Sequence, residues 1–325
     1  MFLNRQNSKR GRINCVGFAM VIIIAIVIIV SYQGATGADL KQKMFKSPDE
    51  AVKTLIESVR AKDKEELLAI FGPSGKEIIS SGDEVADREI GERFVKAYEE
   101  KNKVVSESDA KMVLHVGKED FPFPIPIVKK GELWFFDTQA GKEEILNRRI
   151  GRNELSTIQA CLAYVDAQRE YARRSRDVGL MEYAQRFASS PGKRDGLYWD
   201  AKEGETPSPL GPMVARAVKE GYKKKEDGKQ AQEQTRIPYH GYYYKILKAQ
   251  GKNSPGGEYD YVVRGKMIGG FALVAYPAEY GLSGVMTFIV NHEGVVYEKD
   301  MGKATEKLAS AMKKFDPDKT WKRAE

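Results

Sequence analysis

The sequence predicts an α+β protein with two domains, in each of which helices come before an antiparallel sheet. Apolar residues recur at helical spacing through residues 48–98 and alternate with polar ones through residues 111–137, which predicts helices and then a curved sheet. A strongly amphipathic segment at 156–174 and alternating segments between 239 and 299 repeat this order. A chain of 325 residues, of which 42% are hydrophobic, is long enough for two cores.

The helices of the first domain have recognisable starts. Ser47 followed by Pro48 and then Glu50 is typical of an N-cap, a first helical position and a capping glutamate. A second helix is expected from Asp63 until glycine and proline at 72–73 end it. A third helix carries apolar residues at steps of four: Ile90, Phe94 and Tyr98. The buried face of the first helix is expected to comprise Val52, Leu55, Ile56 and Val59.

Three strands are predicted after these helices, at residues 111–116, 121–128 and 132–137, with a hairpin turn at 130–131. Proline occupies every second position of the second strand, at 122, 124 and 126. Because proline has no backbone N–H, it cannot donate a hydrogen bond to a neighbouring strand. We therefore expect residues 121–128 to form an edge strand. Together these elements make a domain over residues 44–150.

A second domain is predicted over residues 153–325, because a polar, glycine-containing stretch comes before a capping box at Ser156. The helix that begins there is expected to run to about residue 174. Its apolar stripe comprises Leu155, Ile158, Leu162 and Val165. A further helix is predicted at 209–221, and residues 222–236 are almost wholly polar, which favours a solvated, mobile connection.

An antiparallel meander is expected to pack on the helix at 156–174. Its strands are predicted at residues 239–247, 269–277, 285–290 and 295–299, and a closing helix at about 305–314. Glycines supply the tight connections between these strands.

Residues 1–38 have the order of a secretory signal. Basic residues precede an apolar run at 15–30, and small residues follow at 35–38. We expect cleavage after Gly37 or Ala38 and a mature protein in the periplasm or elsewhere in the cell envelope. The alternative is an uncleaved signal anchor, because residues 13–38 carry no charge and are long enough to cross the cytoplasmic membrane as a transmembrane helix.

Charge and cysteine content argue against several functions. Four of the seven net positive charges lie in residues 1–38, so the mature chain carries about +3. A nucleic-acid partner is not expected, because lysine and glutamate are interspersed rather than concentrated on one basic face. Cys15 lies in the signal region, and Cys161 is then alone, which leaves no disulfide and no cysteine-based zinc site. We expect Cys161 to be a small core residue.

Four motifs suggest a family. Residues 195–199 read DGLYW, residues 208–212 read SPLGP, residues 238–242 read PYHGY, and residues 275–288 read AYPAEYGLSGVMTF. Over most of residues 45–325 the chain resembles a bacterial family of exported proteins known as domain of unknown function 2950. The family name implies no activity.

Two looser resemblances concern the fold. The packed helices and the GELWFF strand at 131–136 resemble the cone-shaped nuclear-transport-factor-two-like fold. Enzymes on that fold use an acid and a histidine inside the cone, but we expect Asp109, His115 and Asp120 on the surface or rim. The segment at 156–172 and the strand motifs after it resemble the globular, pilin-head-like half of pseudopilin-type proteins, which pack a small antiparallel sheet on one long helix. The export segment is not continuous with that helix, so only the fold is expected to be shared.

No catalytic residue, cofactor or metal ligand is predicted. The three histidines lie far apart in the sequence, and none has a known catalytic spacing. His240 is the best catalytic candidate, because it stands among tyrosines beside Gly241, but we expect its ring to pack on those tyrosines. His292 lies in a predicted hairpin turn.

An aromatic partner-binding surface is predicted on the C-terminal sheet, because tyrosine combines a large apolar face with a hydrogen-bonding tip. It comprises Tyr239, His240, Tyr242, Tyr276, Glu279 and Tyr280. In the alternative interpretation these rings merely cover the helix at 156–174.

The function predicted from these features is that of a non-catalytic exported protein that binds another envelope protein or a surface polymer. Membrane contact is expected only through residues 13–38, if they are not cleaved. The alternative is a small-ligand-binding or hydrolytic envelope protein that uses the cone-like pocket or the tyrosine and histidine cluster near His240.

Overall fold

The computed structural model describes residues 42–177, 179–220, 222 and 237–324. The predicted signal or anchor at 1–38 and residues 223–236 of the predicted mobile connection lie outside these residues. The chain divides into Met1–Leu40 and a compact unit, Lys41–Glu325, which holds every described element. None of the helices within the described residues combines the length and the apolar composition that a membrane span needs.

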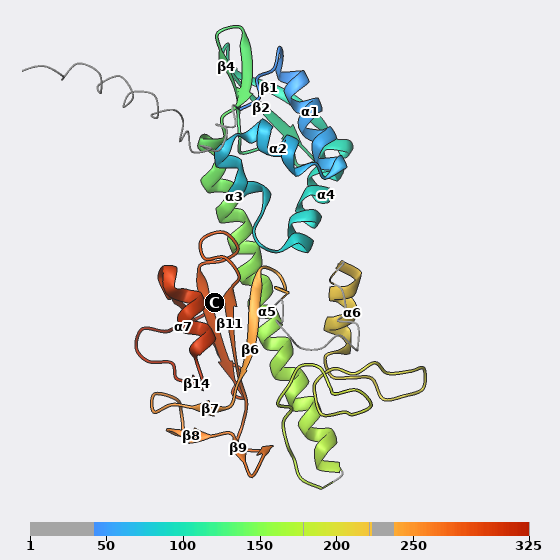
Figure 1. Ribbon diagram of the computed structural model, residues 1–325, viewed down its shortest axis with the longest axis vertical. Helices are drawn as coiled ribbons and strands as arrows, with labels where there is room; N and C mark the ends of the chain where they lie inside the picture. Colours follow the sequence, from blue (N-terminus) through green and yellow to red (C-terminus); the bar gives the residue numbers. More distant parts are fainter. Residues whose placement is uncertain (1–41, 178, 221, 223–236, 325) are drawn as a thin grey trace, which may run out of the picture. The chain divides into compact units, whose positions relative to one another are not determined.

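The predicted α+β class is confirmed, with helices before strands in the first half (Figure 1). The elements of this half are α1 (Pro48–Ala61), α2 (Lys64–Phe71), a 3₁₀ turn (Pro73–Gly75), α3 (Lys76–Ile79), α4 (Glu84–Glu100), β1 (Asn102–Ser108), β2 (Lys111–Val116), β3 (Phe121–Pro122), β4 (Ile127–Lys130) and β5 (Leu133–Phe136).

The helix starts predicted from the sequence are confirmed. The Ser47 hydroxyl accepts a hydrogen bond from the Glu50 backbone N–H at 3.1 Å, and the Asp63 carboxylate accepts one from the Glu66 N–H at 2.9 Å. Each bond satisfies a donor that the first helical turn leaves free. The predicted face of α1 packs into the first core through Val52, Leu55 and Ile56, while Val59 is only partly buried.

The edge-strand prediction for residues 121–128 is wrong. The first sheet has the strand order β1-β2-β4-β5, with β3 also paired to β2. Residues 121–128 therefore divide between two strands, and β4 lies inside the sheet. Pro124 and Pro126 fall in the gap between β3 and β4, where no ladder hydrogen bond needs a backbone donor. The sequence interpretation also missed β1.

Helix α5 (Thr138–Asp177) is one continuous helix of 40 residues, so the predicted helix start at Ser156 is wrong. The polar stretch at 151–153, expected to separate two domains, lies inside α5. Tertiary contacts hold it helical: Asn153 Nδ2 donates to the Ser283 carbonyl at 2.9 Å, and the Glu154 carboxylate accepts from the Val285 N–H at 2.9 Å. Independent folding of residues 153–325 stays a prediction.

The second half places further helices and strands after α5. These are α6 (Gly211–Glu220), β6 (Tyr242–Leu247), β7 (Ala249–Gln250), β8 (Tyr259–Asp260), β9 (Val262–Val263), β10 (Lys266–Met267), β11 (Ala272–Pro277), β12 (Met286–Asn291), β13 (Val296–Asp300), a 3₁₀ turn (Gly302–Ala304), α7 (Thr305–Ala311), β14 (Lys314–Phe315) and β15 (Lys322–Arg323).

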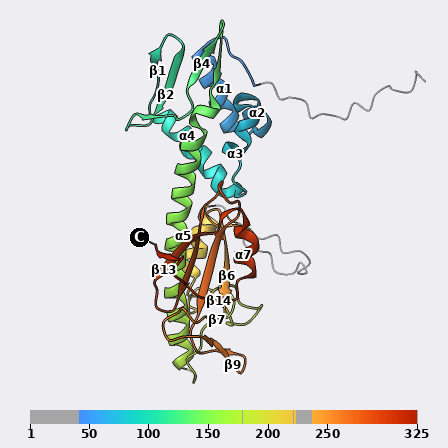
Figure 2. The same cartoon turned by 90° about the vertical axis from the view of Figure 1, so that its left-hand side faces the viewer.

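The predicted packing of a long helix on an antiparallel meander is confirmed. The main sheet has the order β15-β13-β12-β11-β6, with α5 along one face and α7 on the other (Figures 1 and 2). Every residue of β11 is buried, as expected for a strand covered on both faces.

The helix face that meets this sheet matches the predicted stripe at Ile158, Leu162 and Val165, which pack in the second core, but not at Leu155. Leu155 is 64% exposed, whereas Cys161, Tyr164 and Val165 are buried. The Tyr164 and Phe271 rings meet edge to face with centroids 5.6 Å apart. Cys161 is the small core residue that the sequence predicted, and burial raises the pKa of its thiol to about 12.

The continuity of α5 can be tested at Gly151. A Cβ added there would meet no atom within 4 Å, and alanine favours a helix interior over glycine by about 0.5–1 kcal/mol. Gly151→Ala should therefore raise the free energy of unfolding by about that amount in urea denaturation. Gly131→Ala is the opposite control, because Gly131 has a φ of +64° in the β4–β5 turn and alanine should destabilise it. Equal, near-zero effects of the two substitutions would contradict a helical Gly151.

Candidate functional site

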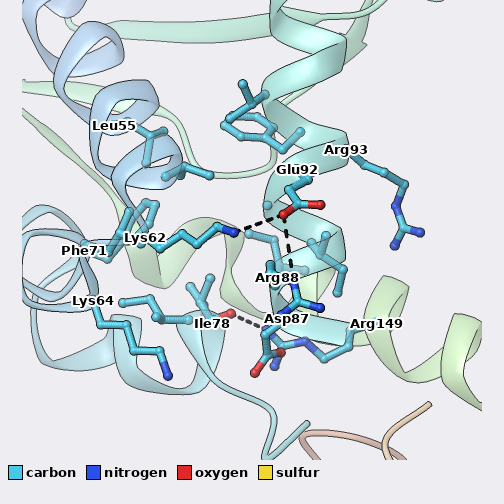
Figure 3. A pocket seen from close by; sticks show the side chains of 18 of the residues that line it. Leu55, Lys62, Lys64, Phe71, Ile78, Asp87, Arg88, Glu92, Arg93 and Arg149 are labelled. Atoms are coloured by element: carbon cyan, nitrogen blue, oxygen red, sulfur yellow. Dashed lines mark hydrogen bonds and ion pairs between the residues drawn. The ribbon is translucent and has the colours of Figure 1, made fainter. Parts of the chain in front are cut away.

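A cavity of about 830 Å³ opens between α1, α2, α4 and α5 (Figure 3). This volume lies within the range of small-molecule binding sites, which is about 300–1,000 Å³. Most of the wall is apolar. The larger apolar side chains that line it are Leu55, Val59, Leu67, Phe71, Ile78, Ile79, Ile90, Phe94, Val95, Phe123 and Ile145.

The cavity borders the apolar face of α4, which is only partly buried although Phe94, Ala97 and Tyr98 pack against the first core. Ala86 is the only buried residue among the 17 of this helix. Ile90 and Phe94, which the sequence places on one helix face, are only partly buried and line the cavity. An amphipathic helix normally packs such a face against a core. The partly buried face of α4 is therefore the main apolar surface on which a ligand could lie.

The polar part of the wall is mostly basic, and most of its cations are already paired. Lys62 and Arg88 converge on the Glu92 carboxylate at 3.2 and 3.9 Å (Figure 3). The other cations with ion pairs are Arg60 with Glu99, Lys64 with Glu84, Arg93 with Glu89, and Arg148 with Glu144.

Two arginines on the α5 wall differ from these six. Arg149 is only 4% exposed and donates to the backbone carbonyls of Glu77, at 2.7 Å, and Ile78. Its Nε has no acceptor in the part of the chain that the structure describes. Arg152, one helical turn later, has no carboxylate within ion-pair distance among the described residues. Burial lowers the pKa of the Arg149 guanidinium, and partial desolvation together with the charge of Arg93 lowers that of the exposed Arg152.

Asp87 is an acid in the same wall and lies beside Arg149 (Figure 3). Its carboxylate oxygens accept hydrogen bonds from the Ser81 N–H at 2.9 Å and the Ser81 hydroxyl at 2.7 Å. Burial raises the pKa of Asp87, even though Ser81 and Arg149 act in the opposite direction. Asp87 is thus held by Ser81 rather than by an ion pair with Arg149.

The residues of the predicted partner-binding surface do not form a common exposed face. Tyr242 and Tyr276 are buried, so their predicted exposure is wrong. Tyr242 packs against Gly284, where there is no room for a Cβ, and its hydroxyl donates to the Met286 carbonyl at 2.9 Å. Glu279 is exposed and Tyr280 partly so. A partner-binding role for these positions stays a prediction.

Tyr239 and His240 belong to a tight hairpin before β6. His240 and Gly241 have φ angles of +50° and +75°, and Tyr239 N–H donates to the Tyr242 carbonyl at 2.9 Å, as in a two-residue turn with positive φ at both central positions. The His240 ring lies 4.1 Å from that of Tyr239, centroid to centroid, so the predicted packing on tyrosine is confirmed. Burial lowers the pKa of His240, although the Glu220 carboxylate at 3.6 Å raises it.

Asp83 links this hairpin to α4, and sequence reasoning missed it. Its Oδ1 accepts from the backbone N–H groups of Val85 and Ala86 at 3.2 and 3.1 Å, as an N-cap does. Its Oδ2 accepts from the Tyr222 hydroxyl and from the Gly241 N–H, both at 2.8 Å. An aspartate before an apolar helical stretch signals the cap, but no local signal points to partners 139 and 158 residues away. Tyr222, which the sequence placed in a solvated segment, is buried.

The remaining candidates from the sequence lie away from the cavity. His115 Nδ1 lies 3.0 Å from the Asp120 carbonyl oxygen, so the structure brings these two residues together. Asp109 lies in the turn between β1 and β2. His292 follows β12 in the predicted turn. None of the three histidines lines the cavity, and within the described residues no three histidine, cysteine or acidic side chains come together as a metal site requires.

Because Asp83 both caps α4 and bonds to Tyr222 and Gly241, we expect its substitution to lower the free energy of unfolding more than the loss of a helix cap alone would. Asparagine caps helices as well as aspartate does, but its amide nitrogen cannot accept hydrogen bonds from Tyr222 and Gly241. Asp83→Asn should therefore lower the free energy of unfolding by about 2–4 kcal/mol. Asp63→Asn is the matched control: Asp63 caps α2 only, and less than about 1 kcal/mol is expected. Similar losses for both variants in urea denaturation would show that the bonds to Tyr222 and Gly241 do not stabilise the fold.

Comparison with known proteins identifies the family. No curated protein and no solved structure matches the chain. The resemblances to pseudopilin-type proteins and to the nuclear-transport-factor-two-like fold therefore stay predictions. Residues 42–324 match the family described as Protein of unknown function (DUF2950). That match spans nearly all of the described residues and agrees with the motifs at 195–199 and 275–288, and the chain belongs to this family.

Proposed function

We propose that this protein is a non-catalytic, exported binding protein that holds a small ligand with an apolar body in the cavity between α1, α2, α4 and α5. The observation that carries the proposal is the partly buried apolar face of α4, where Ile90 and Phe94 line a cavity of about 830 Å³. An apolar surface that the fold leaves partly exposed gains free energy when a ligand removes it from water, at about 25 cal/mol per Å².

A binding role fits the chemistry of the wall better than catalysis does. Apolar side chains line much of the cavity, and most of the cations beside them are already held in ion pairs, so few polar groups are left to contact a ligand, as is usual in a small-molecule site. Asp87 is a partly buried acid of the wall, and both of its oxygens accept hydrogen bonds from Ser81. General acid–base catalysis needs a group within hydrogen-bond reach of the substrate, and His115, His240 and His292 all lie elsewhere.

The cellular location belongs to the same proposal. It rests on the order of basic, apolar and small residues in residues 1–38. An exported protein that carries an apolar molecule through water would need to shield it, and a cavity with a largely apolar wall shields the part of the molecule that enters it. A protein or polymer partner was the first expectation from the sequence, but burial of Tyr242 and Tyr276 removes two of its anchors.

Ligand binding can be tested with the neutral fluorescent probe N-phenyl-1-naphthylamine, which brightens in apolar sites. The wild-type protein should bind it saturably. Ile90→Trp should weaken this binding about tenfold or more, because the larger ring occupies the space beside α4. The control is Leu155→Trp on the exposed face of α5, where the same bulk should leave binding unchanged.

Two outcomes would contradict the proposal. One is the absence of saturable binding to the folded wild-type protein. The other is equal binding by wild type and Ile90→Trp, which would place the probe outside the cavity. Circular dichroism of each variant shows whether the fold is kept.

A further inference from the structure

We infer that the ligand of this cavity is an amphipathic acid, a molecule with an apolar chain or ring system and one anionic head group, and that the head group binds at Arg149 and Arg152 on α5. This inference rests on the proposed function and adds the chemical class of the ligand. The steps that support it concern the pairing of the cations, the geometry of α5 and the separation of charged from apolar wall.

The first step is that the other cations of the wall have their charges matched. Each has a carboxylate within ion-pair distance, as for Lys64 with Glu84 at 3.3 Å and Arg93 with Glu89 at 2.6 Å. These pairs lie at exposed positions, where a second anion would have to compete with the bound carboxylate. These paired cations are therefore expected to contribute little to the affinity for an anionic ligand.

The second step is that Arg149 and Arg152 have no such partner in the described part of the chain. Glu89 lies near Arg152 but is paired with Arg93, and Asp87 is held by Ser81. Arg149 is nine-tenths buried, donates only to backbone carbonyls, and keeps its Nε without an acceptor. Asp87 lies nearby but not within ion-pair distance, so the charge of the buried Arg149 is only partly compensated, and an anion that enters the cavity would compensate it further.

The third step is geometric. Residues three apart on a helix lie on the same face, and both arginines line the cavity from the middle of the unbroken helix α5. Arg152 can bind a carboxylate or phosphate through two parallel hydrogen bonds. Arg149, whose Nη1 and Nη2 donate to the carbonyls of Glu77 and Ile78, offers its charge and its Nε. Two adjacent arginines on a rigid helix thus make a head-group site for one acid.

The fourth step concerns the apolar part of the ligand, which would extend from the arginines toward the apolar wall of the cavity. Leu55 on α1 and Phe71 on α2 lie across the cavity from Arg149 (Figure 3). Ile90 and Phe94 on α4 continue this apolar wall. A charged end and an apolar end in one cavity match a molecule with the same division.

The test compares molecules of equal length as competitors of N-phenyl-1-naphthylamine: dodecanoate, dodecyl phosphate and neutral 1-dodecanol. Both acids should displace the probe at a concentration about tenfold lower than the alcohol does. Arg152→Gln should weaken dodecanoate binding about tenfold and leave 1-dodecanol and the probe unchanged. Arg152 is the residue to substitute because it is exposed and donates to no backbone group in the described structure, so its loss should spare the fold.

Lys64→Gln is the matched control, since it removes one wall cation that already has a partner, and dodecanoate affinity should change less than about twofold. Arg149→Lys keeps a charge but loses the Nε donor that lacks an acceptor, and, if circular dichroism shows the fold kept, it should weaken both acids more than the alcohol. Equal displacement by acid and alcohol, or equal losses in Arg152→Gln and Lys64→Gln, would overturn the inference while leaving apolar binding intact. Failure of the probe itself to bind would instead contradict the proposed function.

Discussion

The continuity of helix α5 is the constraint on which both cores and the cavity depend. Near its start, the Thr138 hydroxyl donates to the Phe71 carbonyl at 2.8 Å, and Ile145 packs against the first core. Further along, Tyr164 and Val165 belong to the second core. Because one rigid helix serves both cores, the turn between them, which carries Arg149 and Arg152, is held in place from both sides. A break at this turn would free the two arginines from the cavity wall.

The cavity follows from how α4 is held rather than from a missing side chain. Asp83 caps the start of α4 and bonds to Tyr222 and Gly241, so that end is firmly tied. Beyond Ala86, no residue of α4 is buried. Near its other end Ala97 and Tyr98 pack against the first core. Between the two ends the apolar face of α4 is only partly covered along the cavity, and a ligand there would complete its packing.

The helix caps and most strands could be predicted because they depend on residues close together in the sequence. The features that were predicted wrongly depend on contacts between distant segments. Caps at Ser47 and Asp63 and the alternation in β6 and β11–β13 depend on neighbours in sequence, and those predictions are confirmed. The helix start at Ser156 was wrong because Asn153 and Glu154 bond to the distant segment at 283–286, which keeps the preceding polar turns helical. The edge strand at 121–128 was wrong because prolines can also sit in a break between two strands.

The candidate site was less predictable than the fold. The stripe of Ile90 and Phe94 was visible in the sequence, but a stripe that packs and a stripe that lines a cavity look the same there. Arg152 falls in the polar stretch at 151–153 that suggested a domain boundary, and Arg149 lies just before it. Only the structure shows that both line the cavity with no carboxylate of the described residues within ion-pair distance. Hydrogen exchange followed by mass spectrometry, with and without saturating dodecanoate, tests this account most directly. The account predicts added protection in α4 and in the turn of α5 that carries Arg149 and Arg152, with the C-terminal sheet unchanged. Protection confined to β6 and β11–β13, or none anywhere, would contradict it.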